Sequence, residues 1–212
     1  MKAVKKILNN IFIDGLSGMA LGLFSTLIIG TILKQIGDLM GGTYGGYLST
    51  FAIIAQRLTG AGIGIGVAYK FKESTYVLLS AAAAGMIGAY ASNLIAGTLL
   101  SEQGALVLLG PGEPLGAFVA AYVGITVGRL VAGKTKLDLL ITPAVTILSG
   151  GAVGILVGPG VSRFMTWLGD LVNWGTEQQP ILMGIVVSVI MGMVLTLPIS
   201  SAALGIILGL NG

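Results

Sequence analysis

GPGEPLG, residues 110–116, is a turn rich in glycine and proline that carries one carboxylate, Glu113, between two long apolar runs. In a chain this hydrophobic, irregular backbone beside a charged group is stable only where protein or trapped water surrounds it. We therefore interpret the turn as the edge or floor of a solute site. Two other polar interruptions, Gln56-Arg57 and TLPISS at 196–201, are expected to surround the same site.

The composition is that of an integral membrane protein. Of the 212 residues, 55% are hydrophobic and 9% are charged, whereas soluble domains carry about 25% charged residues. The mean hydropathy is +0.98. The 35 glycines follow no collagen-like period, so they indicate close helix–helix approach and broken helices. The formal charge of +3 does not indicate nucleic-acid binding, because the lysines lie at segment ends rather than in one patch.

The sequence contains no cysteine and no histidine. Disulfides, thiolate nucleophiles and iron–sulfur ligands are therefore excluded, and the commonest proton shuttle, metal ligand and phosphate acceptor is missing. The sequence also lacks the HExxH, GxSxG and paired-carboxylate motifs of hydrolytic enzymes. We expect no catalytic residue, no metal site and no cofactor, and we do not expect an enzyme.

Apolar runs predict about six transmembrane helices within a single all-α membrane domain, residues 1–212. Five of them fall within 11–158, at about 11–33, 44–69, 75–100, 115–131 and 137–157, each close to the length of about 20 residues that a bilayer requires. The residues GPG at 158–160 are expected to end the fifth helix. Residues 161–175 then place apolar side chains at helical spacing beside Trp167 and Trp174, which predicts an amphipathic helix lying along the interface.

Residues 181–212 are expected to hold the sixth helix and the start of a re-entrant hairpin. The sixth apolar run, at about 181–197, is broken by PISS at 198–201, and the following run at 202–210 is short. The sequence ends directly after this run without a polar tail, which suggests a truncated chain. Another re-entrant excursion is expected at 101–116, because its apolar middle, 105–109, is too short to span a bilayer.

The distribution of basic residues predicts the orientation in the cell membrane. With a cytoplasmic N-terminus, the outer side carries only Lys34 and Arg163. The positive-inside rule therefore favours this arrangement. The basic residues on the cytoplasmic side are then Lys2, Lys5, Lys6, Lys70, Lys72, Lys134 and Lys136.

Two of the polar residues have more than one interpretation. An arginine near the middle of a membrane costs at least about 2.5–3.5 kcal/mol on insertion scales and needs a carboxylate, helix carbonyls or water nearby. Either Gln56 and Arg57 face a polar cavity, or Arg57 is a structural ion-pair partner, or the segment is two short pieces with Arg57 near an interface. Asn93 either contributes to the site or makes an interhelical hydrogen bond.

Several stretches of the chain resemble the EIIC permeases of the phosphotransferase system. The similar stretches are ITPAVT at 141–146, GILVGPG at 154–160 and PILMG at 180–184, joined by GEPLG at 112–116 and PISSAA at 198–203. The resemblance covers about 16–212. It is closest to fructose-type EIIC proteins and, among these, to their stand-alone relatives in the PfoR-like toxin-regulator branch.

The resemblance implies a homodimer with an EIIC-like fold. A solute would bind in a transport domain near re-entrant hairpins, and a carboxylate on an acidic loop would hydrogen-bond its hydroxyls. In such systems a partner EIIB, phosphorylated on cysteine, phosphorylates the sugar on the cytoplasmic side. This chain departs from that pattern, because it has no cysteine, no histidine and no attached EIIA or EIIB domain. Any phosphotransfer would require a separate EIIB protein.

Two hypotheses about function follow. The first is a PTS-type permease that binds a small polar solute, a sugar or polyol, and translocates it by alternating access; an anionic solute paired with Arg57 is equally allowed. The alternative is an EIIC-like membrane sensor or regulator that binds a solute without phosphorylation-coupled transport. The expected partners are the lipid bilayer, the solute, a separate EIIB and a second copy, but no nucleic acid. The expected solute-binding residues are Gln56, Arg57, Asn93, Gly112, Glu113, Thr196, Ser200 and Ser201.

Overall fold

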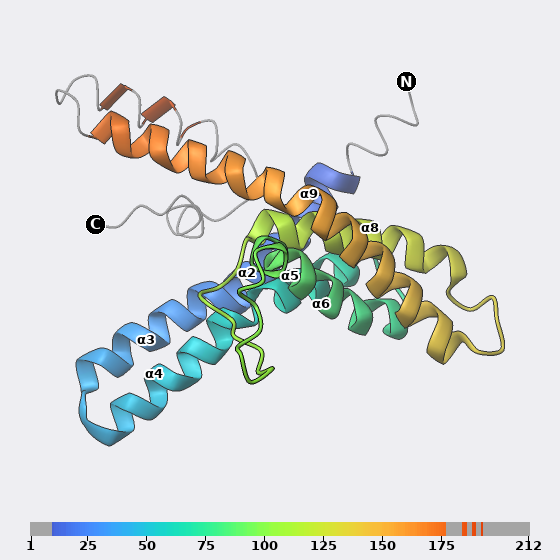
Figure 1. Ribbon diagram of the computed structural model, residues 1–212, viewed down its shortest axis with the longest axis horizontal. Coiled ribbons are helices and arrows are strands. Elements are labelled where there is room, and N and C mark those ends of the chain that lie inside the picture. The colour runs from blue at the N-terminus through green and yellow to red at the C-terminus, as the bar shows by residue number, and fades with distance from the viewer. Residues whose placement is uncertain (1–9, 177–183, 186–187, 190–191, 193–212) are drawn as a thin grey trace.

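The computed structural model describes residues 10–176, 184–185, 188–189 and 192, and these residues are predominantly helical (Figure 1). No β-strand occurs among them, although one isolated antiparallel bridge joins Leu100 and Leu106. The predicted all-α class is confirmed.

The first membrane-spanning helix is longer than expected. It consists of η1 (Asn10–Gly15), α2 (Leu16–Leu23), η2 (Phe24–Ile28) and α3 (Ile29–Met40), in which η denotes short π-helical turns. The predicted end near residue 33 is wrong, because the helix continues for two further turns to Met40. It stops at Gly41, whose φ of 62° lies in the left-handed region that favours glycine.

The second apolar segment is bent. Helices α4 (Gly42–Arg57) and α5 (Thr59–Lys70) meet at Leu58 with an angle of 53° between them. The hydroxyl of Thr59 donates to the carbonyl of Gln56 at 2.6 Å, and side-chain hydroxyls that bond helix carbonyls in this way are a common cause of helix bends. The segment is therefore two short pieces, and Arg57 ends the first. The position of Arg57 near a membrane interface stays a prediction.

The remaining helices are α6 (Thr75–Ala89), α7 (Ala91–Ile95), α8 (Pro114–Val131) and α9 (Asp138–Thr176). Helix α9 runs without interruption through residues 158–160, so the predicted end of the fifth helix at this point is wrong. Residues 161–175 are helical as expected, but they continue α9 instead of forming a separate element. Their position along a membrane interface stays a prediction.

Packing explains why the Gly-Pro-Gly stretch does not end α9. A Cβ built on Gly158 would lie 2.7 Å from the Cβ of Ala91, and one on Gly154 would lie 3.1 Å from the Cα of Gly88. Helix α9 is therefore held against α6 and α7 along the two turns that lead up to Pro159. Proline is tolerated inside membrane helices when neighbouring elements stabilise the backbone in this manner.

Five helices form a closely packed body, in which α6 contacts α5, α8 and α9, and α2 packs on α5 (Figure 1). Small residues bring the backbones together: a Cβ on Gly18 would lie 2.6 Å from the carbonyl oxygen of Gly66, and one on Gly124 would lie 2.7 Å from that of Thr146. The fully buried side chains Met19, Leu23, Ile63, Val67, Val77 and Ile125 fill the spaces between these contacts.

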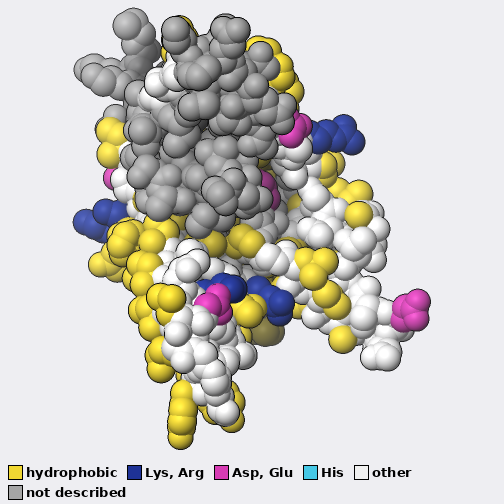
Figure 2. All heavy atoms as spheres, turned by 90° about the vertical axis from the view of Figure 1, so that its left-hand side faces the viewer, with side chains coloured by type: hydrophobic (Ala, Val, Ile, Leu, Met, Phe, Trp, Pro, Cys, Tyr) yellow, Lys and Arg dark blue, Asp and Glu magenta, His cyan; other side chains and the backbone are white. Residues whose placement is uncertain are grey.

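Helices α3 and α4 form a hairpin that extends from this body (Figure 1). Its tip is strongly exposed, with Leu39 at 86% and Tyr44 at 80% of their full accessibility. Figure 2, which views the molecule from the side of the hairpin, shows hydrophobic side chains over much of this surface. Such a surface is expected of helices that face lipid.

Three helices of the described chain are long and apolar enough to cross a membrane: Ile11–Met40, Pro114–Val131 and Asp138–Trp167. The bent pair α4–α5 is a fourth candidate if it counts as one span, and Thr75–Ala89 is a shorter apolar helix. Each of the five segments expected within 11–158 therefore has a helical counterpart, although the third ends well before residue 100. The expected sixth helix and hairpin, 181–212, lie almost wholly outside the described residues.

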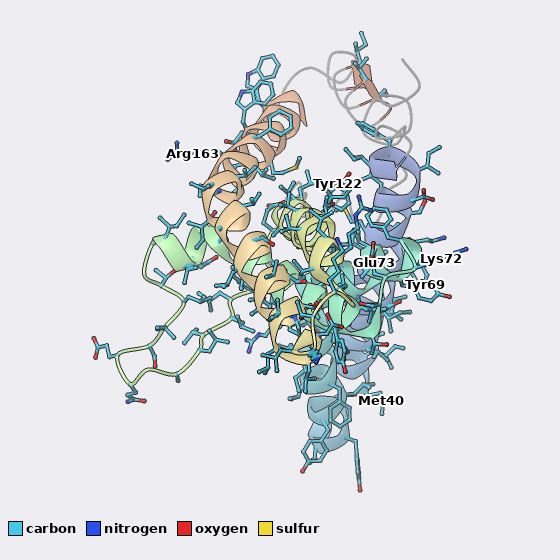
Figure 3. All side chains as sticks on the ribbon, turned by 90° about the vertical axis from the view of Figure 1, so that its right-hand side faces the viewer. Met40, Tyr69, Lys72, Glu73, Tyr122 and Arg163 are labelled. Atoms are coloured by element: carbon cyan, nitrogen blue, oxygen red, sulfur yellow. The ribbon has the colours of Figure 1, made fainter. Side chains whose placement is uncertain are left out.

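The loop between α7 and α8 extends away from the helical body, as the green segment of Figure 3 shows. It contains a short hairpin in which the amide of Val107 donates to Leu99 at 2.9 Å and that of Ser101 donates to Ala105 at 2.9 Å. Leu106 and Leu109 are exposed on it. The expected excursion of this loop into a bilayer stays a prediction.

Candidate functional site

A cavity of about 270 Å³ lies where the loop before α8 meets the ends of α6 and α7 and the middle of α9. It brings together three of the residues expected from the sequence, Asn93, Gly112 and Glu113. The described residues that line it are Ala89, Ser92, Asn93, Leu109, Pro111, Gly112, Glu113 and Ser162.

The loop forms one wall of this cavity because backbone contacts fix it to the end of α6. The amide of Glu113 donates to the carbonyl of Ala89 at 2.7 Å. Gly112 has a φ of 74°, and a Cβ there would lie 2.8 Å from the Cβ of Ala89. A larger residue would therefore be strained in conformation and would also push the loop from the helix.

Glu113 is the N-cap of α8, and its Oε1 accepts a hydrogen bond from the amide of Leu115 at 3.3 Å. Burial raises the pKa of the Glu113 carboxyl to about 7, against the lowering effect of that hydrogen bond. Burial therefore keeps part of the carboxyl population protonated at pH values where an exposed glutamate is fully ionised. The protonated carboxyl can donate one hydrogen bond and accept another, which suits a ligand with several hydroxyl groups.

Asn93 lines the cavity from α7 (Ala91–Ile95). Its Nδ2 donates to the hydroxyl of Thr98 at 3.4 Å, and Thr98 lies five residues further along, just after the end of α7. The described structure therefore gives no interhelical hydrogen bond to Asn93, and it places the residue beside Ser92 at the cavity. Amide and hydroxyl groups of this kind fix the orientation of small polar ligands.

Gln56 and Arg57 do not line this cavity. The amide of Gln56 donates to the hydroxyl of Thr31 at 3.1 Å and so joins α4 to α3. Arg57 is exposed and makes no salt bridge within the described part of the chain. Its carbonyl accepts a hydrogen bond from the Tyr90 hydroxyl at 3.2 Å. Thr196, Ser200 and Ser201 lie outside the residues that the structure describes.

Sequence reasoning missed three residues near the site. Ser92 and Ser162 line the cavity. Tyr90 does not line it but binds the loop, because its hydroxyl donates to the carbonyl of Gly110 at 2.7 Å. Tyr90 and Ser92 lie some twenty residues before the Glu113 turn, whereas Ser162 comes about fifty residues after it. No local motif marks any of them, because their role depends on the packing of α7 and α9.

At another end of the body, the turns between α5 and α6 and between α8 and α9 lie side by side. They share a surface cavity of about 510 Å³ lined by Ser74, Thr75, Tyr76, Ala132, Gly133 and Asp138. Glu73 and Arg129 form an ion pair at 4.0 Å across them. Burial raises the pKa of Glu73, while the Arg129 charge lowers it. Figure 3 shows Tyr69, Lys72 and Glu73 at this end.

The comparisons with known proteins give one match. The family model described as "Phosphotransferase system, EIIC" matches residues 13–212, nearly the whole chain. No curated protein and no solved structure matches the chain.

Proposed function

This chain belongs to the EIIC family of the phosphotransferase system, and from that premise we propose that it is a membrane permease. It binds a small polar solute, a sugar or polyol, and translocates it by alternating access. The observation that carries the proposal is one cavity lined by the part-buried carboxyl of Glu113 together with Asn93, Ser92 and Ser162.

The chemistry of this cavity supports a neutral, hydroxyl-rich solute. Its polar side chains comprise one carboxyl, one amide and two hydroxyls, and no lysine or arginine lines it among the described residues. Its volume of about 270 Å³ is close to the lower end of the range of about 300–1,000 Å³ that small-molecule sites occupy. An anionic solute would lack a charge partner there, so a sugar or polyol is favoured over an anion.

The positions of the basic turns support a cytoplasmic N-terminus in a plasma membrane. Lys70 and Lys72 precede α6, and Lys134 and Lys136 precede α9; the two turns adjoin the same surface cavity. Four lysines therefore gather at one end of the helical body, and the positive-inside rule assigns such an end to the cytoplasm.

We expect the protein to act with partners of the same system. The sequence holds neither cysteine nor histidine, so it has no side chain of the kind that carries the phosphoryl group in these systems. The chain itself is then not an enzyme, and phosphorylation of the solute requires a separate EIIB. A homodimer is the expected assembly. Both expectations come from the family.

The first experiment is a thermal-shift screen of the purified protein against neutral hexoses and hexitols, represented by fructose and mannitol, and against small anions. Glu113→Gln tests the cavity, and Glu102→Gln is the matched control because Glu102 is exposed on the same loop and does not line the cavity. A shift with fructose or mannitol that Glu113→Gln abolishes and Glu102→Gln retains supports the site. A shift that both variants retain rules out Glu113.

Transport and sensing are separated by flux into sealed vesicles that contain only this protein. A permease moves the bound solute across the membrane, and in the absence of EIIB the solute emerges unmodified. A protein that binds the solute without any flux, including after addition of a phosphorylated EIIB, is a membrane sensor instead.

A further inference from the structure

Tyr90 joins three interruptions of the helical backbone that are distant in the sequence. It occupies the break between α6 and α7, and its side chain is almost completely buried, at 2% exposure. Its hydroxyl lies 2.7 Å from the carbonyl oxygen of Gly110, in the cavity loop, and 3.2 Å from that of Arg57, at the bend between α4 and α5. One side chain therefore contacts both the wall of the cavity and the bend of a span.

A tyrosine hydroxyl carries a single proton, whereas both of its neighbours here are acceptors. The two carbonyls therefore share one donor. The hydrogen bond to Gly110 is the stronger of the two, because its donor–acceptor distance is shorter. The other freed carbonyl at the bend, that of Gln56, is already bonded by Thr59. The carbonyl of Arg57 depends instead on a residue of another helix.

Sharing one proton makes the two contacts interdependent. If the loop moves away, the hydroxyl turns fully to Arg57 and the bend is reinforced. If the bend changes, the hydroxyl turns fully to Gly110 and the loop is held more firmly. A motion that breaks both contacts leaves two carbonyls and a hydroxyl without partners in a buried place, which is costly.

We infer that Tyr90 is a positioning residue that couples the α4–α5 bend to the wall of the Glu113 cavity. The loop is attached to the same break at two further points, the Glu113–Ala89 hydrogen bond and the close contact of Gly112 with Ala89. The wall consequently moves with the end of α6, and Tyr90 transmits that position to the bend. Only the statement that the wall binds a solute rests on the proposed function.

The absence of cysteine allows a direct test with pairs of spin labels. The first pair, Tyr47→Cys with Ile65→Cys, spans the bend from α4 to α5, and a straight helix would place the two residues about 27 Å apart. The second pair, Leu106→Cys with Ile65→Cys, measures the loop against α5. All three native side chains are exposed. Distances are measured by double electron–electron resonance in lipid nanodiscs.

Each pair is combined with Tyr90→Phe and, as the control, with Tyr122→Phe. Tyr122 is a partly buried tyrosine of α8 whose ring packs on Phe71 and Phe118 with centroids 5.8 and 6.0 Å apart. Losing the shared hydrogen bond raises the population of displaced loops by roughly tenfold. We expect Tyr90→Phe to broaden both distance distributions and Tyr122→Phe to leave them unchanged. Unchanged distributions in Tyr90→Phe, or a change in only one pair, overturn the coupling.

A second measurement covers the case in which Tyr90→Phe does not fold. Hydrogen exchange of the unmutated protein is followed by mass spectrometry in peptides that cover residues 54–62 and 105–114. The same peptides are followed in Gly112→Ala, whose added methyl pushes the loop from α6. If the hydroxyl is shared, exchange becomes faster in 105–114 and slower in 54–62, because the displaced loop leaves the donor to Arg57. An unchanged or faster rate in 54–62 contradicts the inference.

Measurements of solute binding show whether the coupling through Tyr90 or the proposed solute is wrong. With fructose or mannitol as the probe, Tyr90→Phe is expected to weaken binding while Tyr122→Phe retains it. If neither probe binds the unmutated protein but Tyr90→Phe still broadens both distributions, the proposed solute is wrong and the coupling stands. If binding is normal and the distributions do not change, the coupling is wrong and the solute site stands.

Discussion

The helical body and the interrupted region around Glu113 are held together by opposite means. In the body, helix backbones touch through small residues, as at Gly18 and Gly66 or at Gly124 and Thr146. In the interrupted region, the backbone departs from the helix three times, and side-chain hydroxyls and backbone amides bind the freed carbonyls. The first region depends on the absence of side chains, and the second depends on particular polar ones.

This difference shows how a chain with few charges separates stability from chemistry. Lipid-exposed helices associate mainly through close packing rather than through the hydrophobic effect, so the body needs glycine and tolerates little enlargement. The cavity needs hydrogen-bond donors and acceptors. Such groups are stable in an apolar chain where interrupted helices leave backbone groups that need polar partners. Substitutions in the body should therefore affect folding, whereas substitutions around Glu113 should affect binding and pH dependence.

The largest effect is expected from enlarging a glycine of the body. Gly64 of α5 lies against the backbone of α6, and a Cβ there would overlap the carbonyl group of Ala81. Because backbone cannot move aside as a side chain can, Gly64→Val should lower the free energy of unfolding by about 3 kcal/mol or more. Size-exclusion chromatography and thermal unfolding of the purified variant measure this loss.

Gly46→Ala is the matched control for this prediction. Gly46 lies on α4, in the hairpin, and a Cβ there would meet no atom within 4 Å. The change should stabilise the helix by about 0.5–1 kcal/mol, because alanine loses less backbone entropy than glycine. Similar stability of Gly46→Ala and Gly64→Val would contradict the distinction between hairpin and body.

The next effect is a pH dependence that originates at Glu113. Its carboxyl has a pKa raised to about 7 in the folded protein, compared with 4.5 for the free group. Between these values the folded state binds more protons than the unfolded one, so stability falls as the pH rises from about 4.5 to 7 and is then constant. The fall is of the order of 3 kcal/mol.

Glu113→Gln should remove that part of the pH dependence. The variant and the unmutated protein should be equally stable near pH 4, and the variant should be the more stable of the two at pH 8. Glu73 also titrates with a raised pKa, but it is present in both proteins and cancels in the comparison. Parallel stability curves for the two proteins from pH 4 to 8 would show that Glu113 is not buried.

An intermediate effect is expected from Tyr90. Tyr90→Phe leaves the carbonyls of Gly110 and Arg57 without their shared donor and should lower the free energy of unfolding by about 1–3 kcal/mol. Chemical denaturation of this variant and of Tyr122→Phe measures the difference. Equal losses in both variants would mean that the hydroxyl of Tyr90 contributes nothing beyond the ring.

The smallest effect is expected at Arg57, where the sequence alone left three interpretations. Arg57 is exposed at the end of α4 and does not line the described cavity. Arg57→Leu should therefore change the binding of fructose or mannitol by no more than about twofold, the scale of an ordinary surface substitution. A loss of binding, or a new preference among anions, would mean that Arg57 takes part in solute binding.

The sequence could predict those features that depend on local composition. Apolar runs located the five helical segments, and the carboxylate in GPGEPLG marked Glu113, one of the residues that line the cavity. The sequence could not predict the continuity of α9. Gly158 and Pro159 are local helix breakers, and packing on α6 and α7 overcomes their effect. Nor could the sequence identify Tyr90 or Ser162, whose roles arise from contacts between distant segments.

The most direct test of the solute site uses one introduced thiol at a time. Leu109 lines the cavity, whereas Leu106 lies on the same loop outside it, and both are exposed. Single Leu109→Cys and Leu106→Cys variants are reacted with a maleimide in the presence of increasing fructose or mannitol. We expect the solute to slow the labelling of Leu109→Cys and not that of Leu106→Cys. Equal protection at both positions, or none at Leu109→Cys under conditions in which the solute binds, would contradict a site at Glu113.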